Sequence, residues 1–150
     1  MKNLFNKQDT EEMIARINNL TAETKPEWGK MNVAEMLAHC SVAYEMVYTD
    51  KYPKPGAFGR FFLKMFIKSA VVGPKPYSQN GRTAPQFLVG ADKDFEAEKK
   101  RLIDYIRKTQ ELGESHFHNK ESHSFGPLTK DEWNVSFSKH LDHHLRQFGV

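Results

Sequence analysis

The feature that most constrains this fold is helical periodicity in four long segments. Apolar residues recur there at steps of three and four positions, as on the buried side of an amphipathic helix, and the segments cover residues 9–20, 32–48, 91–112 and 129–148. Asn32 with Glu35, and Thr129 with Glu132, have the spacing of a capping box, which marks a helix N-terminus. Gly113 is suited to end the third helix. The sequence therefore predicts an all-α fold, most simply a four-helix bundle.

The 150 residues are sufficient for one domain, residues 1–150, with one hydrophobic core. The connection between the second and third helices is long and rich in Pro and Gly, and within it residues 60–72, RFFLKMFIKSAVV, have the pattern of a short amphipathic helix. We expect its apolar side to be buried against the bundle, because amphipathic helices usually serve core burial; that side carries Phe61, Phe62, Met65, Phe66 and Val72. Two alternatives stay open, a lid with anion-attracting lysines and a contact with a membrane surface.

The net charge of +3 is unevenly distributed along the chain. Between Lys51 and Gly90 there are seven basic side chains and no acidic one, so the rest of the chain carries a net negative charge. One basic segment is narrower than the face that nucleic-acid binding needs, and we expect no nucleic-acid partner. The segment fits a local anion site instead, with Lys64 and Lys68 as candidates for binding an anionic cofactor.

Nothing in the sequence indicates membrane insertion or export. No uncharged apolar run approaches the roughly 20 residues of a membrane span, and the stretch MKNLFNKQDTEEM lacks the apolar region of a secretory signal. The single cysteine, Cys40, excludes an internal disulfide and suits a reducing compartment. We therefore expect a cytoplasmic protein without stable membrane insertion.

The stretch KHLDHHLRQFGV, residues 139–150, holds three closely spaced histidines. At about 100° per residue, His140 and His144 fall on the apolar stripe of their helix, one turn apart. His143 falls on the polar margin, toward Lys139 and Arg146. Two buried imidazoles need hydrogen-bond partners or a metal, because burial of an unpartnered polar group is costly. The helical phase therefore selects His140 and His144 as ligands of one cation.

A third ligand is expected from a facing helix. His39 lies in or beside the apolar face of residues 32–48, where neighbouring alanines leave space. We predict a metal site formed by His39, His140 and His144, because these three histidines can converge from two facing helices. A three-histidine set with open coordination positions is typical of catalytic sites. Imidazole ligands suit Zn, Ni, Cu or Fe, and ligand type alone does not choose among them.

Other residues are weaker functional candidates. Glu35 lies one turn before His39 and is a candidate acid–base group, although its capping-box role is the stronger explanation. Tyr44 is a candidate hydrogen-bond donor to a substrate, and core packing explains it equally well. We expect the Cys40 thiol to be packed rather than to act as a ligand. A solvated polar loop is expected to hold the remaining histidines, His116, His118 and His123.

Two motifs resemble the DinB/YfiT-like superfamily. They are WGKMNVAEMLAHC, residues 28–40, and HLDHHLRQFG, residues 140–149. The stretch NGRTAPQF…DFEAEKKRL and the ending FGPLTKDEW…KHLDHHLRQFGV are similar to one uncharacterised branch of that superfamily. The resemblance implies a bundle with up-down-down-up topology, here with an elaborated crossover, and a divalent metal, Zn or Ni, on His39, His140 and His144.

The resemblance also implies a class of activity. Members of the superfamily include S-transferases that use low-molecular-weight thiols, and proteins proposed to be metal-dependent hydrolases. We therefore expect a metal-dependent enzyme that transfers such a thiol to a small electrophilic substrate. Two alternatives stay open: a metal-dependent hydrolase, and a non-catalytic metal- or ligand-binding module of a stress response. The sequence also leaves open whether the chain forms a homodimer.

Overall fold

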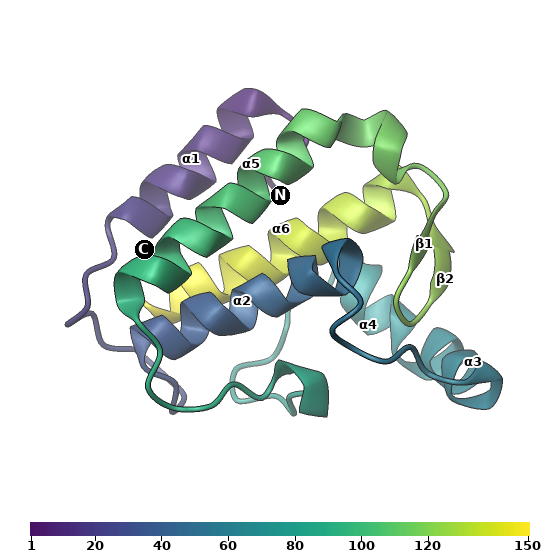
Figure 1. The fold of residues 1–150 in the computed structure, drawn as a ribbon, viewed down its shortest axis with the longest axis horizontal. Coiled ribbons are helices and arrows are strands. Elements are labelled where there is room, and N and C mark those ends of the chain that lie inside the picture. The colour runs from purple at the N-terminus through teal and green to yellow at the C-terminus, as the bar shows by residue number, and fades with distance from the viewer.

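The computed structural model describes all 150 residues and is mostly helical. Four long helices form the body of the molecule: α1 (Lys7–Asn18), α2 (Val33–Tyr48), α5 (Phe95–Phe117) and α6 (Lys130–Gln147). Figure 1 shows these helices lying alongside one another. The predicted all-α class needs one correction, because a small two-stranded sheet is also present. None of the helices has the length and apolar content needed to cross a membrane.

Local capping signals set the starts of the long helices. Both predicted capping boxes are present, at Asn32 with Glu35 before α2 and at Thr129 with Glu132 before α6. Each cap side chain accepts a hydrogen bond from the backbone N–H three residues later, and the glutamate carboxylate accepts one in return. α1 begins earlier than predicted, because the side chain of Asn6 caps it.

Helix α5 differs from the predicted segment at both ends. It begins after Asp94, whose side chain accepts a hydrogen bond from the backbone N–H of Ala97 at 2.7 Å. Gly113 adopts a left-handed φ of 71°, as a helix-ending glycine does. The chain nevertheless resumes a helical course to Phe117, which is fully buried and packs against the ring of Phe137. Burial of Phe117 therefore accounts for the extra turn beyond the glycine.

The long helices share one apolar core. Fully buried side chains come from all four of them: Met13, Ile17, Met36, Leu37, Leu102, Ile106 and Leu145. Tyr44 of α2 stacks in parallel on Phe137 of α6, with ring centroids 4.8 Å apart. Fully burying one large apolar side chain contributes about 1.5–3 kcal/mol to stability. This packing fixes the rotational phase of α2 and α6, and with it the direction in which their histidines point.

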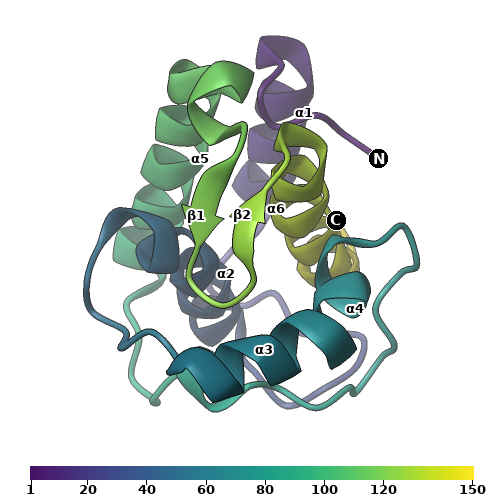
Figure 2. The same ribbon diagram turned by 90° about the vertical axis from the view of Figure 1, so that its right-hand side faces the viewer.

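The crossover between α2 and α5 holds two short helices, α3 (Ala57–Phe66) and α4 (Lys68–Val72), and the 3₁₀ turn η1 (Pro85–Phe87). The single amphipathic helix predicted here is therefore interrupted, at Ile67. The predicted burial of its aromatic side is wrong, because Phe61 and Phe62 are 60% and 52% exposed. Figure 2 shows the reason: α3 lies across one edge of the molecule, away from the long helices.

A β-hairpin replaces the polar loop expected after α5. Its strands, β1 (Lys120–Ser122) and β2 (Gly126–Leu128), pair antiparallel. The hydroxyl of Ser122 donates to the carbonyl oxygen of Gly126 at 2.7 Å, which closes the turn. Figure 2 shows the hairpin above α3, at the end of the bundle.

The hairpin changes the environment of one histidine. His116 and His118 are exposed, as expected, although His116 lies in the last turn of α5 and not in a loop. His123 is only 8% exposed, and its Nε2 lies 3.1 Å from the carbonyl oxygen of Pro53. The prediction of a solvated side chain is therefore wrong for His123, because the hairpin places it against the start of the crossover.

Candidate metal site

Three histidines from α2 and α6 converge between these helices. Their ring centroids lie pairwise between 4.5 and 5.0 Å apart, and the candidate ligand atoms of His39, His140 and His144 all lie within 4.8 Å of one another. Nε2 of His39 is 3.0 Å from Nε2 of His140. The structure thus brings together the three residues predicted as ligands, because core packing turns their two helix faces toward each other.

A backbone carbonyl orients His39. Its Nδ1 lies 2.9 Å from the carbonyl oxygen of Phe87 in η1. A carbonyl oxygen only accepts hydrogen bonds, so neutral His39 carries its proton on Nδ1 and keeps the Nε2 lone pair toward His140. Metal-binding histidines are usually oriented by a hydrogen bond of this kind. The crossover therefore contributes to the cluster through η1.

Two hydrogen bonds in series orient His144. Its Nδ1 donates to Oε1 of Gln147 at 2.8 Å, and Nε2 of Gln147 donates to the carbonyl oxygen of Trp28 at 2.7 Å. Because the Trp28 carbonyl can only accept, it sets the orientation of the Gln147 amide and, through it, the proton position on His144. The Nε2 lone pair of His144 is therefore left unprotonated, like that of His39.

Gly29 makes room for this pair of hydrogen bonds. Its φ of +86° lies in the left-handed region that favours glycine. A Cβ at this position would also lie 2.5 Å from Nε2 of Gln147. A side chain at position 29 would therefore strain the backbone and displace the amide that orients His144.

Burial keeps the three imidazoles neutral. His39 and His144 are buried, and His140 keeps part of its surface exposed. Desolvation lowers the pKa of His39, and it lowers the pKa of His144 to about 3. Desolvation and the neighbouring histidines together place the pKa of His140 well below its usual range. Neutral imidazole is the form that binds metals. The cluster is therefore in its ligand form at neutral pH.

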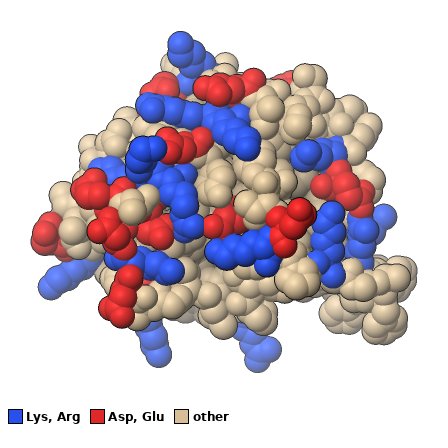
Figure 3. Space-filling view, viewed as in Figure 1, with Lys and Arg blue, Asp and Glu red and all other residues tan.

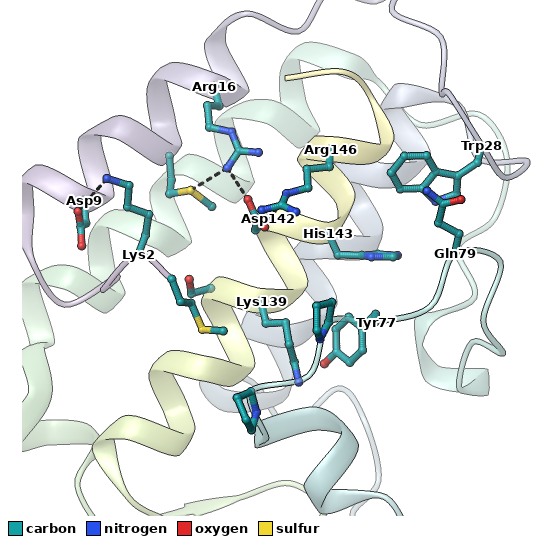
Figure 4. A pocket seen from close by; sticks show the side chains of 15 residues that line it. Lys2, Asp9, Arg16, Trp28, Tyr77, Gln79, Lys139, Asp142, His143 and Arg146 are labelled. Atoms are coloured by element: carbon teal, nitrogen blue, oxygen red, sulfur yellow. Dashed lines mark hydrogen bonds and ion pairs between the residues drawn. The ribbon is translucent and has the colours of Figure 1, made fainter.

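A cavity of about 670 Å³ lies on the His143 side of α6, lined by residues of the N-terminal segment, α1, α6 and the crossover and by Trp28, but by none of the three candidate ligands. His143 and Tyr77 form part of its wall. The Tyr77 ring meets the ring of His143 edge to face at 5.6 Å between centroids, and it lies 6.4 Å from that of His140. Figure 4 shows His143 extending from α6 toward Trp28, with Tyr77 beside it. These two side chains connect the cavity wall with the histidine cluster.

The polar margin predicted for α6 is only partly exposed to solvent: Arg146 is exposed, whereas Lys139 and His143 are covered. Lys139 is 6% exposed, and its ammonium group donates to the carbonyl oxygens of Ala70 and Gly73 at 2.8 and 2.6 Å. His143 is half-buried between Trp28 and Tyr77. The crossover covers this side of α6, which the sequence pattern of α6 alone does not indicate.

The weaker candidates lie outside the cluster. The Glu35 carboxylate accepts the backbone N–H of Asn32 at 2.9 Å, and Tyr44 is buried in the core with no hydrogen-bond partner for its hydroxyl. Lys68 pairs with Glu132 at 2.7 Å, whereas Lys64 is exposed. Catalytic roles for Glu35 and Tyr44, and cofactor binding by Lys64 and Lys68, stay predictions.

Sequence reasoning missed the groups that orient the rings. The Phe87 carbonyl belongs to the backbone of the crossover, and no side-chain pattern could reveal it. Gln147 could have been found from the sequence, because it follows His144 by three residues and so lies next to it on the helix.

Cys40 is buried as expected, and desolvation raises the pKa of its thiol.

Comparison with known proteins identifies a family. The model of the family DUF1569, described as a protein of unknown function, matches residues 2–149. No curated protein and no solved structure matches the chain. The matched range includes all three histidines of the cluster. The chain therefore belongs to the DUF1569 family.

Proposed function

We propose that the chain binds a divalent transition-metal ion through His39, His140 and His144. The observation that carries this proposal is the pair of hydrogen bonds behind the cluster, from His39 to the Phe87 carbonyl and from His144 to Gln147. Both rings then keep an Nε2 lone pair toward the cluster, and neutral His140 can donate a proton to only one of them. A bound cation would satisfy all three nitrogens at once.

The spacing and the donor set fit such an ion. Two nitrogens at about 2.0–2.1 Å from a tetrahedral zinc ion are about 3.3 Å apart, and the Nε2 atoms of His39 and His140 are 3.0 Å apart. Imidazole ligands suit several transition metals, and of these we propose Zn or Ni, the metals that the resemblance to the DinB/YfiT-like superfamily implies. Three protein ligands leave at least one coordination position for a substrate or cosubstrate.

The course of the helices supports a relationship to the DinB/YfiT-like superfamily. In Figure 1, α1 and α6 run from right to left, whereas α2 and α5 run from left to right. This order of directions corresponds to the up-down-down-up topology that the resemblance implies. The candidate ligands also lie on α2 and α6, the second and the last of the four long helices.

On this basis the chain would be a metal-dependent enzyme, with transfer of a low-molecular-weight thiol to a small electrophile as the favoured reaction. When bound, the ion would act as a Lewis acid that keeps a coordinated thiol deprotonated at neutral pH. The neighbouring cavity, at about 670 Å³, has the size of a small-molecule site. Burial raises the pKa of Tyr77 to about 12, so its phenol is protonated at neutral pH; in this structure it donates to the carbonyl oxygen of Val71 at 3.4 Å.

Glu35 bears on the choice between thiol transfer and hydrolysis. A hydrolase would gain from a carboxylate that acts as general base on water. Glu35 is the carboxylate nearest in sequence to His39, and its oxygen accepts from Asn32 in the capping box. This engagement favours thiol transfer, in which a bound metal would lower the pKa of the coordinated thiol and the thiol proton would pass to water.

Metal content tests the binding proposal. The chain is purified with a tag that contains no histidine and on a resin that contains no nickel, and bound metals are measured by mass spectrometry. We expect close to one Zn or Ni per chain in the wild type and in His116→Ala, an exposed histidine, and a loss of metal in His39→Ala, His140→Ala and His144→Ala. Equal metal content in all five proteins would overturn the proposal.

Turnover tests the proposed reaction separately. The metal-loaded chain is assayed for consumption of several low-molecular-weight thiols with a chlorinated electrophile, and for hydrolysis of activated esters and amides. Thiol consumption that is lost in His140→Ala is the expected result. Hydrolysis alone would identify a metal-dependent hydrolase, and one bound metal without turnover in either assay would identify a non-catalytic metal-binding module.

A further inference from the structure

Helix α3 presents an unusual apolar face to solvent. Five large apolar side chains of this helix are each more than half exposed: Phe58, Phe61, Phe62, Met65 and Phe66. No residue of α3 is buried. Figure 3 shows the α3 end of the molecule, at the lower right, as a projecting group of atoms without an acidic residue. A contiguous exposed patch of this kind indicates an interaction surface.

The rest of the crossover holds this face outward. Arg60, on the opposite side of α3, pairs with Glu121 of the hairpin. Lys68 at the start of α4 pairs with Glu132 at 2.7 Å, and Lys139 binds carbonyl oxygens at the end of α4. These contacts attach the polar side of the α3–α4 segment to the bundle. The apolar face therefore has a fixed direction before any partner arrives.

Charge selects the kind of partner. From Lys51 to Gly90 the crossover has seven basic residues and no acidic one. Lys54, just before α3, and Lys64, within it, are exposed and form no ion pair with the protein. An acidic surface that also accepts aromatic side chains would match both properties. The headgroup region of an anionic lipid bilayer is such a surface.

A second copy of this chain is a poorer match. A two-fold symmetric contact through α3 would place the same surface of each copy opposite itself. The basic segment of one copy would then face the basic segment of the other, and like charges across an interface disfavour association. A lipid surface presents the opposite charge.

We propose that α3 is an interfacial helix that docks the protein reversibly on anionic lipid surfaces. Its phenylalanines would enter the boundary between headgroups and acyl chains, while Lys54 and Lys64 remain at the level of the phosphates. The helix has ten residues, so it lies on the bilayer and does not cross it. The inference does not depend on a metal at the histidine cluster.

Co-sedimentation with vesicles tests this docking. The full chain is mixed with vesicles of phosphatidylcholine alone, or of equal parts phosphatidylcholine and phosphatidylglycerol. We expect binding to the second kind only, weakened by salt because the charge attraction is screened. Phe58→Ser/Phe62→Ser and Lys54→Glu/Lys64→Glu should each weaken binding by roughly tenfold or more. Leu88→Ser is the matched control, because Leu88 is 71% exposed but lies outside α3, and it should bind like the wild type.

Two further measurements keep the result interpretable. Circular dichroism and urea denaturation establish that each variant is folded, and sedimentation velocity gives the oligomeric state without lipid. Absence of binding to anionic vesicles, or equal binding by wild type and the Phe58→Ser/Phe62→Ser variant, overturns the proposal. A dimer that dissociates on the same double substitution also overturns it, because α3 would then join two copies of the chain.

Discussion

Helices α6 and α3 carry the same spacing of apolar side chains in opposite surroundings. On α6, three large side chains at four-residue steps are buried: Trp133, Phe137 and Leu141. On α3, three phenylalanines at four-residue steps are exposed: Phe58, Phe62 and Phe66. Periodicity therefore predicts a helix and its apolar side, but it does not predict what covers that side. Three other long helices cover α6, whereas α3 packs mainly against the short α4.

The basic residues of the two helices differ in the same way. Lys139 of α6 is buried and donates to carbonyl oxygens at the end of α4. Lys64 of α3 is exposed and forms no ion pair. The buried lysine stabilises the fold, because its ammonium group donates hydrogen bonds to carbonyl oxygens that would otherwise lack partners. The exposed lysine keeps its charge available for an external partner.

Alanine substitutions in the buried aromatic residues of α6 and in the exposed ones of α3 should differ most in their effect on the free energy of unfolding. Phe137→Ala should lower the free energy of unfolding by about 3–5 kcal/mol, because it opens a cavity in the core. Phe62→Ala should change it by no more than about 0.5 kcal/mol, because the side chain is already hydrated. Urea denaturation of both variants measures the difference. A large loss of stability in Phe62→Ala would mean that α3 is packed more tightly than the structure indicates.

Removal of a metal bound between α2 and α6 should have the next largest effect on the free energy of unfolding. At a free metal concentration one hundred times Kd, a bound ion raises the free energy of unfolding by about 2.7 kcal/mol. A chelator should remove this contribution from the wild type and have no effect on His140→Ala. Thermal unfolding with and without chelator measures it, and an equal response of both proteins would contradict a role of the cluster in metal binding.

Loss of the Gln147 amide should weaken metal binding without removing a ligand. Gln147→Met and Gly29→Ala should each reduce metal affinity by about 10- to 100-fold, because His144 loses the partner that orients its ring. Competition with a chromogenic chelator measures the affinity. Gln79→Met is the matched control, since Gln79 lines the neighbouring cavity and is exposed. Equal affinity in Gln147→Met and Gln79→Met would mean that the amide does not orient the ligand.

The smallest expected effect concerns an ion pair at the N-terminal end of the bundle. The backbone N–H of Asn3, at 2.7 Å, and Lys2, at 3.2 Å, lower the pKa of Asp9. Because the folded pKa lies below the unfolded value of 3.8, the stabilisation is present above pH 3.8 and is lost as pH falls through the folded pKa. Asp9→Asn should therefore be slightly less stable than the wild type at pH 7, and the two urea midpoints should converge near pH 2. A constant difference across this range would contradict the assignment.

Features that depend on neighbouring residues along the chain could be predicted from the sequence. The capping boxes at Asn32 and Thr129 and the periodic segments located α2 and α6, because helix hydrogen bonds and caps connect residues at most a few positions apart. The same short-range geometry separated His140 and His144 from His143. It also selected His39 from the opposite helix, because an apolar face shows which residues point inward even when the facing element is unknown.

Features that depend on contacts between distant segments could not be predicted from the sequence. The partners that orient the cluster are the carbonyl groups of Trp28 and Phe87, and backbone carbonyls have no signature in a sequence. The burial of Lys139 and the exposure of α3 both follow from the path of the crossover, which covers one face of α6 and leaves the aromatic face of α3 open. Their common physical reason is that burial is a property of two surfaces, and a periodic pattern describes only one of them.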